Sequence, residues 1–214
     1  AGFSIVSYTG NSTSGATVGH GLGIAPEMVI VKIRSGGTND WAVYHYEMHS
    51  SPQNKLMYLN LTNAVTDSSS PWNDTAPTSS VITLGSGNIT NGTTDYIAYC
   101  FHSVEGYSSF GSYTGNGSAD GPFVYTGFRP AFVMVKKTSG TGSWYIYDLT
   151  RLGYNGANYV LAADSSTSEI SGKEIDLLSN GFKWRNTTNN GNASGGTYIY
   201  MAFAENPFKN ANAR

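Results

Sequence analysis

Short runs of alternating apolar and polar residues fill the chain, a period typical of half-buried β-strands. Most of these runs are bounded by Gly, Pro, Asn or Ser clusters, which favour turns. In the first half they predict strands at Phe3–Tyr8, Ala16–His20, Met28–Ile33, Trp41–His45, Lys55–Leu61, Val81–Leu84 and Tyr96–Val104.

Helical periodicity is weak throughout. No segment keeps a 3.6-residue apolar period with capping residues, so we expect at most a turn or two of helix. The least certain assignments are residues 152–158 and 169–178.

The same pattern of strands occurs twice. The pentapeptide SYTGN stands at Ser7–Asn11 and again at Ser112–Asn116, 105 positions apart. Residues 23–32 align with 127–136 at a separation of 104, and residues 96–101 align with 198–203 at 102. Loops tolerate small deletions whereas a strand register does not, so this drift indicates a tandem duplication. We predict an all-β fold of two tandem antiparallel β-sandwich repeats, jelly-roll-like, at residues 1–106 and 107–214.

Aromatic residues recur at matching places in the two copies. Trp41 aligns with Trp144, and Tyr44 aligns with Tyr147. Aromatic side chains bury the largest areas, so these positions are predicted to belong to the core of each copy.

The composition argues against some classes of binding partner. Only 12% of the 214 residues are charged and the formal net charge is −2, which leaves no basic stripe for nucleic acid. The longest apolar runs are far shorter than the roughly 20 residues of a membrane helix, so no membrane insertion is expected. Cys100 is the single cysteine, so no intrachain disulfide can form, which suits synthesis in a reducing cytosol.

No catalytic residue stands out. Gly-x-Ser-x-Gly is absent, the acids are scattered, and the chain is predicted not to be an enzyme. A glycosidase built on two distant carboxylates remains an open alternative, because such a pair leaves no local signature.

Metal-ligand patterns also fall short. His45 and His49 would lie ~13 Å apart on an extended strand, too far for one ion. Residues 116–121 resemble the first half of a calcium loop, but Phe128 stands where the glutamate ligand belongs, so a hairpin turn is predicted instead. We predict no metal and no cofactor.

A sugar-stacking site is the one binding hypothesis that the residues suggest. Trp72, with Asn73 and Asp74 beside it, lies in a polar loop between two prolines and has no tryptophan counterpart in the second copy. An indole face with polar neighbours suits a carbohydrate ring. Alternatively, Trp72 folds back over the end of the sandwich. Arg151, Tyr154 and Asn155 form a second loop of the same character.

Four stretches resemble a duplicated glycine-rich β module of tailed-bacteriophage virion proteins. They are GFSIVSYTGN at 2–11, VGHGLG at 18–23, FGSYTGNGSADGPF at 110–123 and AFAENPFK at 202–209. The likeness covers nearly the whole chain.

The resemblance implies a non-enzymatic structural protein of the virion: a tail fibre, a fibre tip or a capsid decoration. It implies synthesis in the host cytoplasm, exposure on the particle, other virion proteins as partners and a homo-oligomer, with a trimer favoured. Contact with a host-surface glycan follows from the same setting. A lectin-like adhesin is the alternative, and a glycan-degrading enzyme is a more distant one.

Overall fold

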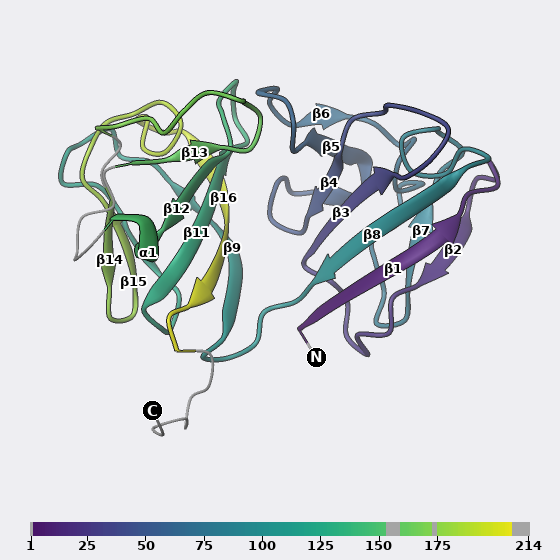
Figure 1. Ribbon diagram of the computed structural model, residues 1–214, viewed down its shortest axis with the longest axis horizontal. Helices are drawn as coiled ribbons and strands as arrows, with labels where there is room; N and C mark the ends of the chain where they lie inside the picture. The colour runs from purple at the N-terminus through teal and green to yellow at the C-terminus, as the bar shows by residue number, and fades with distance from the viewer. Residues whose placement is uncertain (1, 153–158, 173–174, 207–214) are drawn as a thin grey trace. The chain divides into compact units, whose positions relative to one another are not determined.

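A computed structural model describes residues 2–152, 159–172 and 175–206 of the chain. It divides into two compact units, Ala1–His102 and Ser103–Arg214. The boundary expected from the sequence, between residues 106 and 107, falls in the turn that precedes strand β9. The regular secondary structure of each unit is almost entirely β-strand (Figure 1).

The first unit contains two antiparallel sheets. The larger sheet has the strand order β1-β8-β3-β4-β5-β6, and the smaller one pairs β2 with β7. The elements are β1 (Phe3–Thr9), β2 (Ala16–Gly19), β3 (Met28–Ile33), β4 (Ala42–His45), the 3-10 helix η1 (Pro52–Asn54), β5 (Lys55–Tyr58), β6 (Thr66–Asp67), β7 (Val81–Leu84) and β8 (Asp95–Phe101).

The second unit also contains two antiparallel sheets. Their strand orders are β13-β12-β11-β16-β9 and β10-β15-β14. The elements are β9 (Ser108–Thr114), β10 (Phe123–Tyr125), β11 (Pro130–Lys137), β12 (Tyr145–Asp148), the single turn α1 (Leu149–Leu152), β13 (Leu161–Ala162), β14 (Ile175–Leu178), β15 (Gly181–Trp184) and β16 (Thr197–Ala204).

Apart from β6 and β14, the two units share one strand order. The series β1-β8-β3-β4-β5 corresponds to β9-β16-β11-β12-β13, and the pair β2-β7 corresponds to β10-β15. The registers agree as well, since Ile33 lies opposite Tyr96 in the first unit and Lys137 lies opposite Tyr198 in the second. These pairings establish which residues are equivalent.

Aromatic side chains dominate the core. In the second unit, residues of both sheets form one buried cluster, with Tyr147 set edge-on against Trp184 at 5.9 Å between ring centroids. In the first unit Tyr44 meets Trp72 in the same way at 5.8 Å. The two tryptophans pack on equivalent tyrosines although they come from different points of their repeats.

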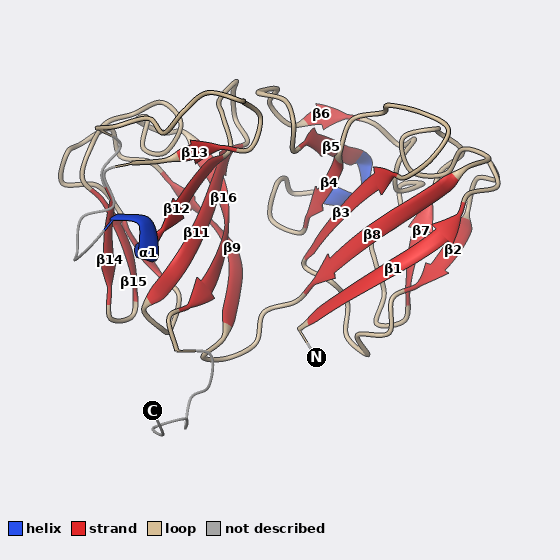
Figure 2. Ribbon diagram, in the orientation of Figure 1, coloured by secondary structure: helices blue, strands red, loops and turns tan. Residues whose placement is uncertain are grey.

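The all-β prediction is confirmed, and helix is limited to η1 and α1 within the described residues (Figure 2). The predicted core positions Tyr44, Tyr147 and Trp144 are buried, but Trp41 is only half-buried. The predicted hairpin at residues 116–121 is wrong, because β9 and β10 belong to different sheets and the turn connects the two.

Candidate functional site

The sugar-stacking prediction for Trp72 is wrong. Its side chain is only 1% exposed, because the loop after β6 folds inward and places the indole edge-on against Tyr44. Asn73 and Asp74 turn the chain there with left-handed φ values of 50° and 48°. Asn73 accepts a hydrogen bond from the Ser14 hydroxyl, and Asp74 is exposed. No indole face is available to a ligand at this loop.

The second predicted loop is described only in part. Arg151 forms an ion pair with Glu169 at 2.6 Å and also donates to the carbonyl of Ile146 at 3.3 Å. Tyr154 and Asn155 lie outside the described residues. Arg151 and Trp72 belong to different units.

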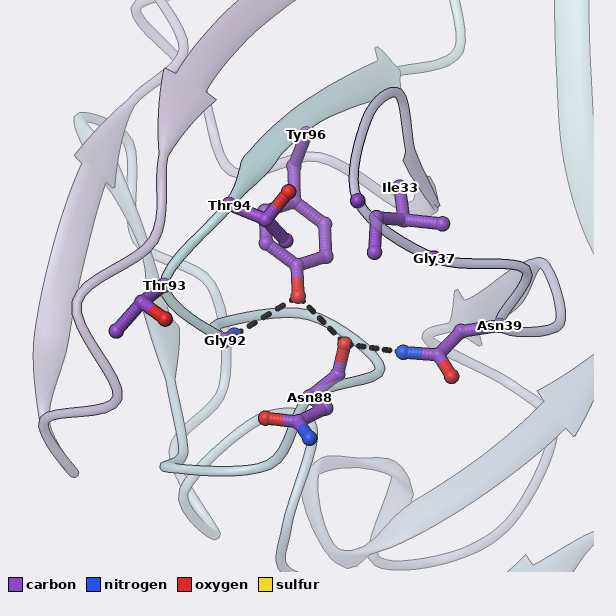
Figure 3. Close-up of a pocket in the computed structure, with 9 residues that line it drawn as sticks. Ile33, Gly37, Asn39, Asn88, Gly92, Thr93, Thr94 and Tyr96 are labelled. Carbon is purple, nitrogen blue, oxygen red and sulfur yellow. Dashed lines mark hydrogen bonds between the residues drawn. The ribbon is translucent and has the colours of Figure 1, made fainter.

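A polar pocket opens at one end of the first unit, with a volume of about 300 Å³. It lies between the loop that follows β3 and the loop that precedes β8 (Figure 3). Its lining residues are Ile33, Gly36, Gly37, Asn39, Asn88, Gly92, Thr93, Thr94 and Tyr96. These residues come from two segments that are far apart in the chain.

Tyr96 braces one side of the pocket, the loop that precedes β8. Figure 3 shows its hydroxyl pointing to the backbone carbonyl of Asn88, to which it donates at 2.5 Å, while it accepts from the Gly92 N–H at 2.8 Å. The side-chain amide of Asn39 donates to the same Asn88 carbonyl at 2.6 Å. Both walls of the pocket are therefore tied to one backbone oxygen.

The rim is fixed by a second set of contacts. The Thr94 hydroxyl donates to the Ser35 carbonyl, and the Ser35 hydroxyl donates to Asp95 at 3.1 Å. Gly36 has a φ of 73°, and a Cβ there would lie 2.9 Å from the Thr94 hydroxyl, so glycine is needed for both reasons. The loop after β3 can approach the loop before β8 this closely because Gly36 has no side chain.

The pocket is electrically neutral. None of its lining residues is Asp, Glu, Lys, Arg or His. Burial raises the pKa of Tyr96, which keeps its phenol protonated as a hydrogen-bond donor. Amide and hydroxyl groups around one aromatic and one aliphatic side chain can bind a neutral polar molecule, but they offer no acid or base to move a proton.

A buried asparagine anchors the loop before β8, which forms one wall of the pocket. Asn91, 1% exposed, accepts from the Asn11 N–H at 2.9 Å and donates to the carbonyls of Thr13 at 2.9 Å and Gly85 at 2.7 Å. Tyr8 adds a hydrogen bond to the carbonyl of Thr90 at 2.6 Å. The loop before β8 is thus anchored to the SYTGN turn that follows β1.

The second unit has the same arrangement, a buried asparagine hydrogen-bonded to the turn after the first strand, which we call the asparagine clasp. Asn192 accepts from the Asn116 N–H at 2.8 Å and donates to the carbonyls of Ser118 at 2.7 Å and Asn186 at 2.9 Å. Tyr113 donates to the Gly191 carbonyl at 2.8 Å, as Tyr8 does to Thr90. The pentapeptide is repeated because one buried asparagine in each unit requires the same turn.

The place equivalent to the pocket differs in the second unit. Lys137, the counterpart of Ile33, reaches across and donates from Nζ to Oδ1 of Asn189 at 2.6 Å. Asn189 is the counterpart of Asn88, since its carbonyl accepts from Tyr198 at 2.7 Å as that of Asn88 does from Tyr96. In the second unit a lysine side chain therefore spans the two loops that are equivalent to the walls of the first-unit pocket.

Other reactive groups are occupied within the fold. Burial raises the pKa of the Cys100 thiol to about 12, so the thiolate nucleophile is disfavoured. His45 and His49 each accept a backbone N–H at Nδ1, from Glu47 at 3.2 Å and Ser51 at 3.0 Å. Among the described residues, no group of three or more His, Cys, Asp or Glu side chains could hold a metal ion, and no helix is long and apolar enough to cross a membrane.

A family model described as a domain of unknown function (DUF7483) matches residues 1–207. The chain belongs to the DUF7483 family. The match runs through both units, so one DUF7483 domain contains the pocket of the first unit and the equivalent place in the second. No curated protein and no solved structure matches the chain.

The sequence alone did not reveal this pocket in the DUF7483 chain. Its walls come from residues 33–39 and 88–96, and no local motif joins them. One signal was present: when the repeats are aligned, Ile33 stands opposite Lys137, an apolar residue against a charged one at an otherwise matching strand end.

Proposed function

We propose that this protein is a non-enzymatic structural component of a tailed-phage particle that contributes to attachment to the host surface. The resemblance of its long repeated motifs to tailed-phage virion modules supports this. A tail fibre, a fibre tip and a capsid decoration all fit the proposal. The chain would be made in the host cytoplasm and exposed on the particle, beside other virion proteins and as a homo-oligomer, with a trimer favoured.

We also propose that the units are jelly-roll-like repeats derived from one duplicated ancestor. The shared strand order and the two matching asparagine clasps support a common origin. Independent origin would not be expected to reproduce the same three asparagine hydrogen bonds, two of which reach the turn.

The observation that carries the attachment proposal is the neutral pocket at the loop end of the first unit. Loops on a rigid sheet scaffold are the usual place for recognition. Here Tyr96 braces the loop before β8, and Asn39 ties the loop after β3 to it through the Asn88 carbonyl, so little ordering entropy is lost when a ligand binds.

A lectin-like glycan-binding module is the second candidate, and the same pocket favours it. Ile33 supplies a small apolar surface, and Asn39, Asn88 and Thr93 supply polar groups. A glycan-degrading enzyme has less support. Asp95, beside the pocket, is not among its lining residues, and its two carboxylate oxygens accept hydrogen bonds from Thr9 at 2.9 Å and Ser35 at 3.1 Å.

Adsorption competition tests the attachment proposal. The purified chain, added in excess to host cells, should reduce adsorption of the phage that carries it. An equal amount of an unrelated β-sandwich protein is the control. Unchanged adsorption at saturating protein would contradict a role in attachment.

A further inference from the structure

We propose that the first-unit pocket is a binding site for a single neutral saccharide residue, and that Lys137 closes the equivalent site in the second unit. Each chain would then bind one sugar. This inference deepens the attachment function proposed above, and it names the class of ligand and the residue that sets the number of sites.

The size and polarity of the pocket point to a sugar. Its volume of about 300 Å³ is at the small end of the roughly 300–1,000 Å³ of ligand pockets, which suits one ring rather than an extended molecule. A saccharide has apolar C–H faces and a rim of hydroxyls that both donate and accept. Tyr96 is fully buried and Ile33 is 7% exposed, so apolar contact with the sugar is limited to a small exposed part of Ile33. Asn39, Asn88 and Thr93 can exchange hydrogen bonds with the rim.

The absence of charge among the lining residues argues for a neutral sugar over an acidic one. A sialic acid or a phosphorylated sugar would be expected to need an Arg or Lys as its partner. Two cations flank Ile33 in sequence, and each has a place outside the lining. Lys32 donates from Nζ to the backbone carbonyl of Asn39. Arg34 lines a different pocket, with Ser7, Tyr8, Thr9 and Asp95.

Ile33 keeps the first-unit site open because its side chain is short and remains at the wall. Its side chain is 7% exposed, and a Cβ on Gly37 would lie 2.8 Å from its Cδ1, so it packs against the loop instead of crossing it. Lys137 at the same register position passes Gly140, where a Cβ would lie 3.3 Å from its Cε, and ends on Asn189. The long side chain thus occupies the space between the loops.

Amide-resolved NMR titration of the full chain tests the inference. The probes are glucose, galactose and N-acetylglucosamine, each raised to tens of millimolar, with N-acetylneuraminic acid as the charged comparison. We expect at least one neutral sugar to shift amides in residues 33–39 and 88–96, with millimolar affinity, and no saturable shifts in residues 137–142 and 189–198.

Two variants and a control make the test specific. Ile33→Lys introduces the second-unit residue and should weaken binding at least tenfold. Thr93→Val removes an exposed hydroxyl at the rim and should weaken binding about threefold or more while leaving the spectrum folded, which keeps the test valid if Ile33→Lys unfolds. Thr17→Val, on an exposed position of β2, should bind like the wild type.

The inference is overturned if none of the neutral sugars shifts the pocket amides, if both pocket variants bind as tightly as the wild type, or if the charged sugar binds more tightly than all three. Saturable shifts in the second-unit segments would overturn the closure by Lys137. These outcomes are separate from adsorption: a chain that blocks adsorption but binds no sugar retains the attachment function and loses only this inference.

Discussion

Replacing Asn91 with alanine removes the clasp between the SYTGN turn and the loop before β8. Three hydrogen bonds are lost, to the Asn11 N–H and to the carbonyls of Thr13 and Gly85. Each is worth about 0.5–1.5 kcal/mol net, and a partner left buried without water costs about 1–3 kcal/mol. Gly85 is buried whereas Asn11 and Thr13 are exposed and can bind water, so we expect a total loss of about 3 kcal/mol.

Urea denaturation followed by far-UV circular dichroism measures this loss. With a denaturant slope of about 2 kcal/mol per M for a unit of this size, the unfolding midpoint should fall by about 1.5 M. Asn192→Ala should produce a matching fall, because Asn192 makes the equivalent three bonds. Asn63→Ala, at an exposed position, should stay within about 0.5 kcal/mol of the wild type. A loss below about 1 kcal/mol for Asn91→Ala would refute the clasp argument.

Two further predictions follow from buried side chains. Trp72→Ala should lower the free energy of unfolding by about 3–5 kcal/mol, because the indole is 1% exposed. Trp72→Phe should cost much less, since the indole N–H finds no acceptor among the described residues. An equal melting temperature for wild type and Trp72→Ala would contradict the burial. Desolvation lowers the pKa of Lys136 from 10.5 to about 8, so above pH 8 the folded chain holds fewer protons there than the unfolded chain and stability rises with pH. We expect this effect to raise the free energy of unfolding by about 1 kcal/mol between pH 8 and 9. Urea denaturation of the wild type and of Lys136→Met at both pH values measures it, and the variant should lack the increase. Identical pH dependence of the two proteins would count against the shift.

Strand positions could be predicted from the sequence because period-2 alternation and turn residues are local signals. Met28–Ile33 and Val81–Leu84, for example, have the same bounds in the prediction and in the structure. The repeated SYTGN turn could also be recognised, but not its purpose. The asparagine that fixes it lies about 80 residues later, and sequence spacing does not reveal a hydrogen bond over that distance.

The sugar-stacking prediction for Trp72 failed for a physical reason. Trp72 stands in a loop of polar residues, and such a composition favours an exposed indole, yet its large apolar surface is more stable packed on Tyr44 than in water. The pocket was missed because its walls are two loops brought together only by the pairing of β3 with β8.

Antibody labelling of intact phage particles in the electron microscope tests the proposed virion role most directly. Antibodies raised against the purified chain should decorate a defined part of the particle, on the tail or the capsid, without disruption of the virion. Particles that stay bare, while the same antibodies detect the chain in the lysate of infected cells, would contradict its place on the virion surface.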